Sequence, residues 1–225
     1  MSRCNRGFTL VEMLVVVAII VILISMLQPS LGLDRPRTAL CLTQMHAITI
    51  GWQAYALDNA RVLVDPFPGV NGWIGNGNSA AANEQGLLPR YYGGGTSLVR
   101  CPSEITNHYR TYSMSDHLGG SWPSSFPRRY LPRDQASRTF VLLEENDWRG
   151  YNAGSWVTYT TEGLWVDYVT AYHDKRSAMN ISFADGHAET WVWQDPRTKS
   201  ISDFYAVTPN NVDLQRLQSV FVTNR

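Results

Sequence analysis

The first 33 residues place the strongest constraint on how this chain folds. No ionisable side chain occurs from Met13 to Leu33, and the most apolar part, Phe8 to Leu27, would be about 30 Å long as a helix. Lipid offers no partners for backbone N–H and C=O groups, so a run of this length inside a bilayer must be helical. One carboxylate, Glu12, lies near the start of the run. A charge inside a membrane segment is unfavourable and usually marks a function or a partner.

The charges around the run predict its direction. Arg3 and Arg6 precede it, and the positive-inside tendency therefore places the N-terminus in the cytoplasm and the chain after Ser30 across the membrane. A secretory signal peptide has a shorter apolar segment and a small-residue cleavage site, and residues 24–32 show neither feature. A plain signal anchor remains open, but it gives no reason for Glu12.

The composition of the chain is that of a globular domain behind this segment. Of 225 residues, 44% are hydrophobic, and 19 basic side chains balance 19 acidic ones. We therefore expect one soluble domain and no basic surface for nucleic acid. Eight Trp and eleven Tyr residues fit either core packing or a surface that stacks on sugars or partners.

Periodic patterns predict the main elements of this domain. Between Arg37 and Asn59, apolar residues recur in steps of four and three, which predicts an amphipathic helix against a sheet; they are Cys41, Met45, Ile48, Trp52 and Tyr55. Residues 65–86, rich in Gly, Asn and Pro, predict a long loop. Strands are expected at Thr139–Glu144, Trp156–Thr160, Asn180–Ala184 and His187–Trp193, and a short helix at Val212–Phe221. Asp185-Gly186 predicts a hairpin turn between the last two strands.

The segment "GFTLVEMLVVVAII", residues 7–20, resembles the N-terminus of type IV prepilins. That pattern is a short basic leader ending in Gly, then Phe, then Glu four residues later, then an apolar helix. The resemblance implies cleavage by a prepilin peptidase between Gly7 and Phe8 and N-methylation of Phe8. Glu12 would then neutralise the N-terminal amine of a neighbouring subunit, and Pro29 falls where many pilins have a helix-kinking proline.

The resemblance also implies a domain organisation and an α+β fold, in which a long N-terminal helix packs on a small antiparallel sheet with long loops. We expect a leader peptide at 1–7, a transmembrane and assembly helix at 8–29, its amphipathic continuation at 30–60 and an extracytoplasmic head at 61–225. Cleavage removes Cys4 and leaves Cys41 and Cys101 as a candidate disulfide that would pin the helix to the head. Two buried thiols are the alternative.

Further segments resemble a subgroup of pilin-like proteins from planctomycetes and related bacteria. They are "CLTQMHAITIGWQAYALDNA", "LVRCPSE", "YSMSDHLGG" and the closing "SFADGHAETWVW". In that subgroup a His often precedes the Asp-Gly pair with nine residues between them. Here eleven residues separate His173 from Asp185-Gly186, which predicts a longer loop between them.

Two groups of residues carry side chains of the kinds that bind metals. His173, Asp185 and His187 carry zinc-type ligands without a zinc-motif spacing, so a hairpin cap by Asp185 and a loop contact by His173 are the simpler interpretation. Calcium is the one candidate cofactor, since a stretch from Glu144 offers several oxygen ligands; they are Glu144, Glu145, Asp147 and Asn152. A solvated acidic turn is the alternative.

These observations favour a structural protein over an enzyme, since no nucleophile elbow, phosphate loop or dinucleotide motif occurs. We expect a pseudopilin of a type II secretion-like or type IV pilus-like filament, held in the cytoplasmic membrane with its head in the periplasm. Its partners would be copies of itself or other pseudopilins, the prepilin peptidase and the assembly machinery. The alternative is a membrane-tethered envelope or polysaccharide-binding protein, with Trp73, Trp122, Trp148 and Trp156 as the candidate binding residues.

Overall fold

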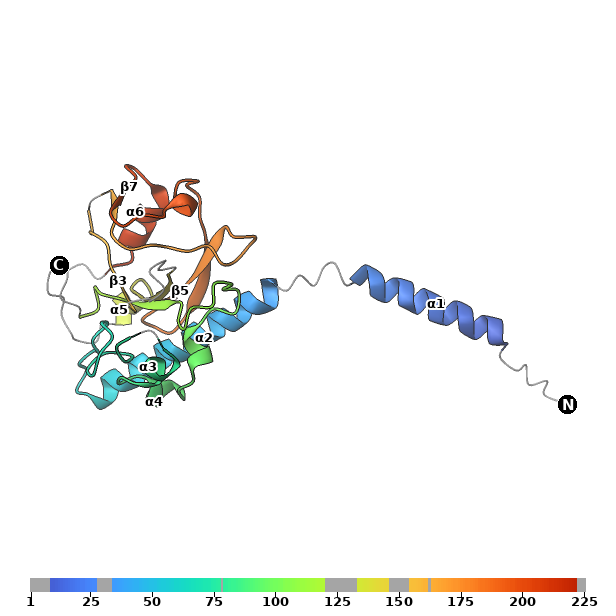
Figure 1. Ribbon diagram of the computed structural model, residues 1–225, viewed down its shortest axis with the longest axis horizontal. Helices are drawn as coiled ribbons and strands as arrows, with labels where there is room; N and C mark the ends of the chain where they lie inside the picture. The colour runs from blue at the N-terminus through green and yellow to red at the C-terminus, as the bar shows by residue number, and fades with distance from the viewer. Residues whose placement is uncertain are drawn as a thin grey trace.

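Two helices open the structure, a computed structural model that describes residues 9–27, 34–77, 79–119, 133–145, 154–161 and 163–221. Helix α1 (Leu10–Leu27) lies apart from the rest of the protein, and α2 (Asp34–Asp58) runs into the globular head (Figure 1). The predicted continuity of the two helices through Pro29 falls on residues 28–33, which lie outside the described residues.

The head combines short helices with short strands. Its helical elements are α3 (Ala80–Glu84), α4 (Pro89–Tyr92), the 3-10 helix η2 (Thr96–Val99), α5 (Arg133–Ala136), the 3-10 helix η3 (Thr198–Ser200) and α6 (Val212–Gln218). Its strands are β1 (Tyr112–Ser115), β2 (Phe140–Glu144), β3 (Ser155–Trp156), β4 (Leu164–Trp165), β5 (Ala178–Phe183), β6 (Ala188–Val192) and β7 (Ala206–Val207). The predicted α+β class is confirmed.

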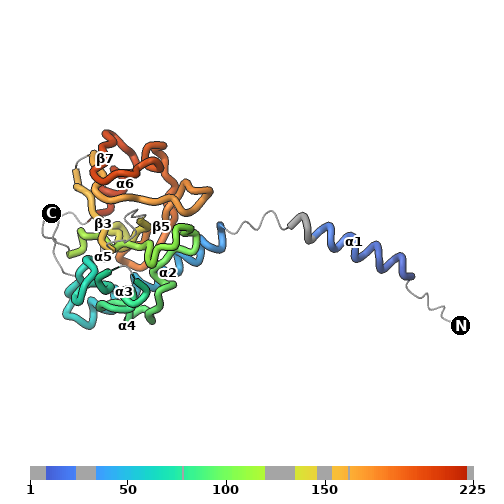
Figure 2. The backbone as a smooth tube through the Cα atoms, viewed as in Figure 1, coloured from blue at the N-terminus to red at the C-terminus, as the bar shows by residue number. Residues whose placement is uncertain are grey.

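Five of the strands form one sheet in the order β3-β1-β2-β5-β6. All neighbours are antiparallel except β1 and β3, which run parallel. Strands β4 and β7 form a separate antiparallel pair. The tube in Figure 2 shows that segments distant in the sequence meet at this sheet, with α2 beside β5 and the C-terminal segments on the other side.

Helix α2 packs on one face of the sheet through the predicted stripe. Four of its residues, Cys41, Met45, Ile48 and Trp52, are fully buried, and Tyr55 is 9% exposed. Side chains alternate along a strand, so the residues of β5 that face α2 are Ala178, Asn180 and Ser182, which are small or polar. Its Ser182 hydroxyl lies 2.8 Å from the Thr49 hydroxyl of α2. The small side chains of β5 let the helix approach the sheet closely enough for these two hydroxyls to form a hydrogen bond.

The opposite face of the sheet carries a second, aromatic core. Met179, Ile181 and Phe183, the alternate residues of β5, point into it. They meet Leu214 and Leu217 of α6 there. The other members are Phe140, Leu143, Trp156, Trp165, Val169, Trp191, Trp193 and Phe221. The predicted C-terminal helix thus exists and covers this face, although it ends at Gln218 and not at Phe221.

Most predicted strands occur, with shifted ends. Strand β2 begins one residue later than predicted, and β5 and β6 form the predicted hairpin around Asp185-Gly186. The strand expected at Trp156–Thr160 is wrong in extent: β3 covers Ser155–Trp156 alone. Its parallel pairing with β1 ends where β1 ends, at Ser115, so the residues beyond Trp156 have no neighbouring strand in this sheet.

Two isoleucines of α2 test whether the buried stripe of this helix stabilises the head. Ile48 is fully buried, whereas Ile50, two residues along the same helix, is 42% exposed. Replacing Ile48 with Ala removes buried methyl groups and leaves a cavity, so we expect the free energy of unfolding to fall by about 2–5 kcal/mol. Ile50→Ala, the matched control, should change it by about 1 kcal/mol or less. Denaturant unfolding of the chain in mild detergent measures both, and equal losses would contradict this packing.

Candidate functional site

The start of α1 contains a capping box. Thr9 precedes the helix, and its backbone N–H and its hydroxyl both donate to Glu12 Oε2 at 2.7 Å. The Glu12 N–H in turn donates to Thr9 Oγ1 at 3.3 Å. This reciprocal Thr-x-x-Glu arrangement satisfies N–H groups that the first turn of a helix leaves without partners. Glu12 therefore has a structural role within its own helix, and the spacing that reveals it is readable from the sequence.

Between Leu10 and Leu23, exposed apolar side chains surround α1. Its large apolar side chains between Leu10 and Leu23 are 45–80% exposed, and no face of the helix is covered by the head. An apolar surface of this extent is unfavourable in water and usually marks contact with lipid or with other apolar surfaces. Among the described residues, none of the helices combines the length and hydropathy needed to cross a lipid bilayer.

A buried cluster in the head joins both predicted cysteines to two further residues. The Cys41 thiol donates to Glu144 Oε1 at 3.1 Å, and that oxygen lies 2.9 Å from His173 Nε2. Cys101 Sγ lies 3.4 Å from the same ring nitrogen. The four residues are at most 1% exposed, and the four ligand-type atoms all lie within 4.8 Å of one another.

Separate elements bring these side chains together. Cys41 lies on the sheet-facing stripe of α2, and Cys101 follows η2. Glu144 ends β2 and shares the α2-facing side of that strand with Leu142, because residues two apart on a strand face the same way. His173 forms an isolated bridge with Ala178 at the start of β5.

The turn after His173 holds this residue against the sheet. Asp174, Lys175 and Arg176 all have positive φ, from 44° to 64°, a conformation that L-residues seldom adopt. The turn closes where the N–H groups of Ser177 and Ala178 donate to the His173 carbonyl at 2.9 and 3.1 Å. The longer loop predicted before Asp185-Gly186 is thus a tight left-handed turn that fixes His173.

Burial and mutual hydrogen bonds shift the pKa values of three members of the cluster. Burial raises the pKa of the Cys41 thiol well above its usual range, whereas a hydrogen bond with Cys41 lowers the pKa of Cys101. Burial alone would lower the pKa of His173, but hydrogen bonds with Cys101 and Glu144 outweigh it and raise that pKa to about 10.

The structure corrects the predicted roles of the cysteines. Cys41 and Cys101 are free thiols and not a disulfide. The disulfide prediction is therefore wrong, and the structure agrees with the alternative of two buried thiols, which lie close together. Their shared contacts with Glu144 and His173 had no signal in the sequence, because the four residues are tens of positions apart.

The calcium hypothesis fails for its two glutamates. Glu144 points into the cysteine cluster, where Oε2 also accepts from the Asn180 N–H at 2.7 Å. Glu145, the next residue, accepts from the Ser113 hydroxyl instead. Neighbouring residues at the end of a strand face opposite ways, so the two carboxylates do not converge on one ion. Asp147 and Asn152 lie outside the described residues.

His173, Asp185 and His187 do not form one site either. His173 is buried, whereas the side chains of Asp185 and His187 are 37% and 42% exposed and contact each other at 2.6 Å. Asp185 Oδ1 also accepts from the His187 N–H, so it caps the hairpin as the simpler interpretation expected. His46 of α2 donates to the Gly186 carbonyl at 2.6 Å and fixes the hairpin on the helix.

Two of the four tryptophans of the sugar-binding alternative belong to the core. Trp73 and Trp156 are fully buried, and their indole N–H groups donate to the carbonyls of Gly154 and Tyr168, each at 2.7 Å. Neither ring offers a face to a ligand, so this part of the prediction is wrong. Trp122 and Trp148 lie outside the described residues.

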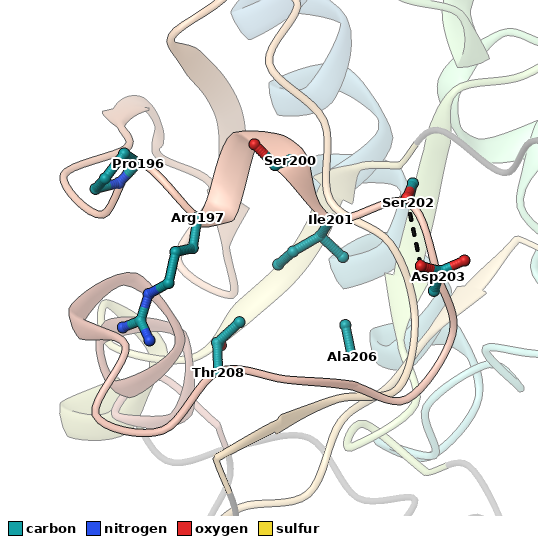
Figure 3. Close-up of a pocket in the computed structure, with 8 residues that line it drawn as sticks. All are labelled: Pro196, Arg197, Ser200, Ile201, Ser202, Asp203, Ala206 and Thr208. Atoms are coloured by element: carbon teal, nitrogen blue, oxygen red, sulfur yellow. Dashed lines mark hydrogen bonds between the residues drawn. The ribbon is translucent and has the colours of Figure 1, made fainter.

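An open pocket of about 480 Å³ lies between η3 and β7. Figure 3 shows its lining, from Pro196 to Asp203 on one side and Ala206 and Thr208 on the other. Arg197, its cationic member, is bound to Asp195 at 2.6 Å and to the Pro209 carbonyl at 3.2 Å. Arg197 is thus already paired within the protein, and we assign this pocket no catalytic role.

Comparison with known proteins identifies the N-terminal segment. Residues 2–27 match the family model of the prokaryotic N-terminal methylation motif. The match includes Gly7, Phe8 and Glu12, and the chain therefore carries a type IV prepilin-like signal. No curated protein and no solved structure gives a significant match to the chain.

Gly186 tests the attachment of the hairpin to α2. Its φ is +100°, and a Cβ there would lie 3.0 Å from Ile50 Cδ1. Gly186→Ala should lower the free energy of unfolding by about 1–2 kcal/mol, since L-residues are strained at positive φ. Gly69→Ala is the control, because a Cβ there meets nothing within 4 Å. Thermal unfolding compares the two, and an unaffected Gly186→Ala would contradict this geometry.

Proposed function

We propose that this chain is a prepilin-like subunit that assembles into a filament through its N-terminal helix. The methylation motif at residues 2–27 carries the proposal. In this scheme a prepilin peptidase cuts between Gly7 and Phe8, and the new Phe8 amine is methylated. The segment from Phe8 to Leu27 then holds the subunit in the cytoplasmic membrane with its head outside.

The exposed surface of α1 supports assembly by helix packing. Apolar side chains surround this helix between Leu10 and Leu23, so the same surface fits lipid before assembly and neighbouring α1 helices in a filament. Separation of α1 from the head leaves it accessible to such neighbours. We infer that the driving contact is apolar and that Glu12 selects the register between subunits.

The register depends on a charge pair in this scheme. Glu12 of one subunit meets the methylated Phe8 amine of the next, and an opposite charge removes the penalty of a lone carboxylate in an apolar surrounding. The capping box persists after cleavage, since Thr9 and Glu12 both remain in the mature chain. Glu12 thus serves its own helix through Thr9 and a neighbouring subunit through its charge.

The role that fits is a pseudopilin of a type II secretion-like system or a subunit of a type IV pilus-like filament. Both use copies of the subunit, a prepilin peptidase and a membrane assembly machinery as partners. The burial of Trp73 and Trp156 removes the described residues that favoured polysaccharide binding.

Three substitutions separate the two roles of Glu12. Glu12→Gln keeps a capping acceptor but removes the charge, Glu12→Ala removes both, and Thr9→Ala removes the capping hydroxyl and keeps the charge. We expect both Glu12 variants to lose filament incorporation at least tenfold, while Thr9→Ala assembles normally. Crosslinking of subunits in cells that contain the peptidase and assembly machinery measures this, with membrane-inserted protein as the control for expression.

Normal assembly of Glu12→Gln together with failure of Glu12→Ala and Thr9→Ala would show that Glu12 acts only as a helix cap. That result would contradict the charge pair, although it would leave processing at Gly7 intact.

A further inference from the structure

We propose that Cys41, Cys101, Glu144 and His173 form a structural zinc site that ties α2 to the sheet. Zinc prefers four ligands from thiolate, imidazole and carboxylate groups in a tetrahedron, and sites closed to solvent are structural. The four residues supply two sulfur atoms, one nitrogen and one oxygen, and all are at most 1% exposed.

The spacing of the ligand atoms fits a tetrahedral ion. Zinc bonds of 2.0–2.3 Å place tetrahedral ligands about 3.3–3.8 Å apart. Here Cys41 Sγ and Glu144 Oε1 are 3.1 Å apart, Cys101 Sγ and His173 Nε2 are 3.4 Å apart, and no pair exceeds 4.8 Å. Changes of up to about 1 Å in the separations between ligand atoms would bring all four atoms to one ion.

The orientation of His173 points the correct nitrogen at this centre. Thr38 donates its hydroxyl proton to the Asp34 carbonyl at 2.7 Å, so its oxygen accepts from His173 Nδ1 at 2.9 Å. A metal-binding His usually donates its second ring N–H to a partner of this kind, which fixes the ring. Nε2 is thereby directed into the cluster.

His173 Nε2 also has more polar neighbours than one ring nitrogen can satisfy. Glu144 Oε1, Cys101 Sγ and the Asn180 side-chain nitrogen lie 2.9, 3.4 and 3.0 Å away. A ring nitrogen offers either one proton or one lone pair. A single ion at the centre satisfies the imidazole, the carboxylate and both sulfurs together, whereas internal hydrogen bonds leave competing contacts.

Further donors surround the other three ligands, as metal sites require. The Tyr112 hydroxyl lies 3.1 Å from Cys41 Sγ, and the Ser103 N–H donates to Cys101 Sγ at 3.4 Å. The Asn180 N–H donates to the outer oxygen of Glu144 at 2.7 Å. These donors stabilise the negative charge that two thiolates and a carboxylate leave around a divalent cation.

An entry path reaches the cluster from one side. Cys101 and Gln44 line a surface depression of about 540 Å³, and Glu104 and His108 lie along the same depression. The other three ligands do not line it. An ion would therefore meet Cys101 first and end in a closed site, which agrees with a structural and not a catalytic role.

Metal analysis of the full-length chain in detergent tests the proposal. After expression with zinc and removal of loosely bound ions, we expect one zinc ion per chain, lost in Cys41→Ser and in Glu144→Gln. Replacement of zinc by cobalt should give a thiolate-to-cobalt charge-transfer band. The control is His187→Gln, which removes an exposed His–carboxylate contact and should retain the full zinc content.

Thr38→Val tests the positioning of His173 without removing a ligand. We expect zinc affinity to fall about 10- to 100-fold, with the cobalt band retained because both thiolates remain. An unchanged affinity would contradict the role of Thr38.

Three results would overturn the zinc site. One is absence of metal from the folded chain with both thiols reduced. Another is a Cys41–Cys101 disulfide in the purified protein, found by mass after thiol blocking. The third is zinc that depends on His187 and not on the cysteines, which would show adventitious surface binding only. The first two results are measured on the wild-type protein, and the third is measured on the surface variant His187→Gln. The test therefore does not depend on whether the core variants fold.

Discussion

The head depends on how closely α2 can lie against the sheet. Its large residues face small or polar side chains of β5, and the hydroxyls of Thr49 and Ser182 meet at 2.8 Å. This close approach also brings Cys41 to the end of β2, where Glu144 lies. The second, aromatic core on the opposite face completes the burial of the sheet, and the polar cluster lies on the α2-facing side, beside the first core.

The N-terminal helix follows a different principle. The head buries most of its large apolar residues in two cores, whereas the large apolar residues of α1 between Leu10 and Leu23 are all exposed. Glu12 links the two levels of organisation. In the single chain it caps the helix through Thr9, and in the proposed filament its carboxylate would pair with the amine of a neighbouring subunit.

Features that depend on neighbours in the chain are readable from the sequence. The α2 stripe and the Asp-Gly hairpin follow from periodicity and turn chemistry, and the methylation motif is local. The cluster of Cys41, Cys101, Glu144 and His173 is not readable, because it requires the strand order β1-β2-β5 and a left-handed turn before β5. The two glutamates of the calcium hypothesis do not converge for a related reason: β2 extends to Glu144, and the alternation of side chains turns Glu144 and Glu145 apart.

Mass spectrometry of the mature N-terminus tests the central claim most directly. The subunit, purified from membranes of cells that contain a prepilin peptidase, should begin at Phe8 with a methylated amine. Cys4 should be absent, because it leaves with the leader. A protein that keeps Met1 and residues 2–7 in the presence of an active peptidase would contradict the account of this chain as a processed, assembling subunit.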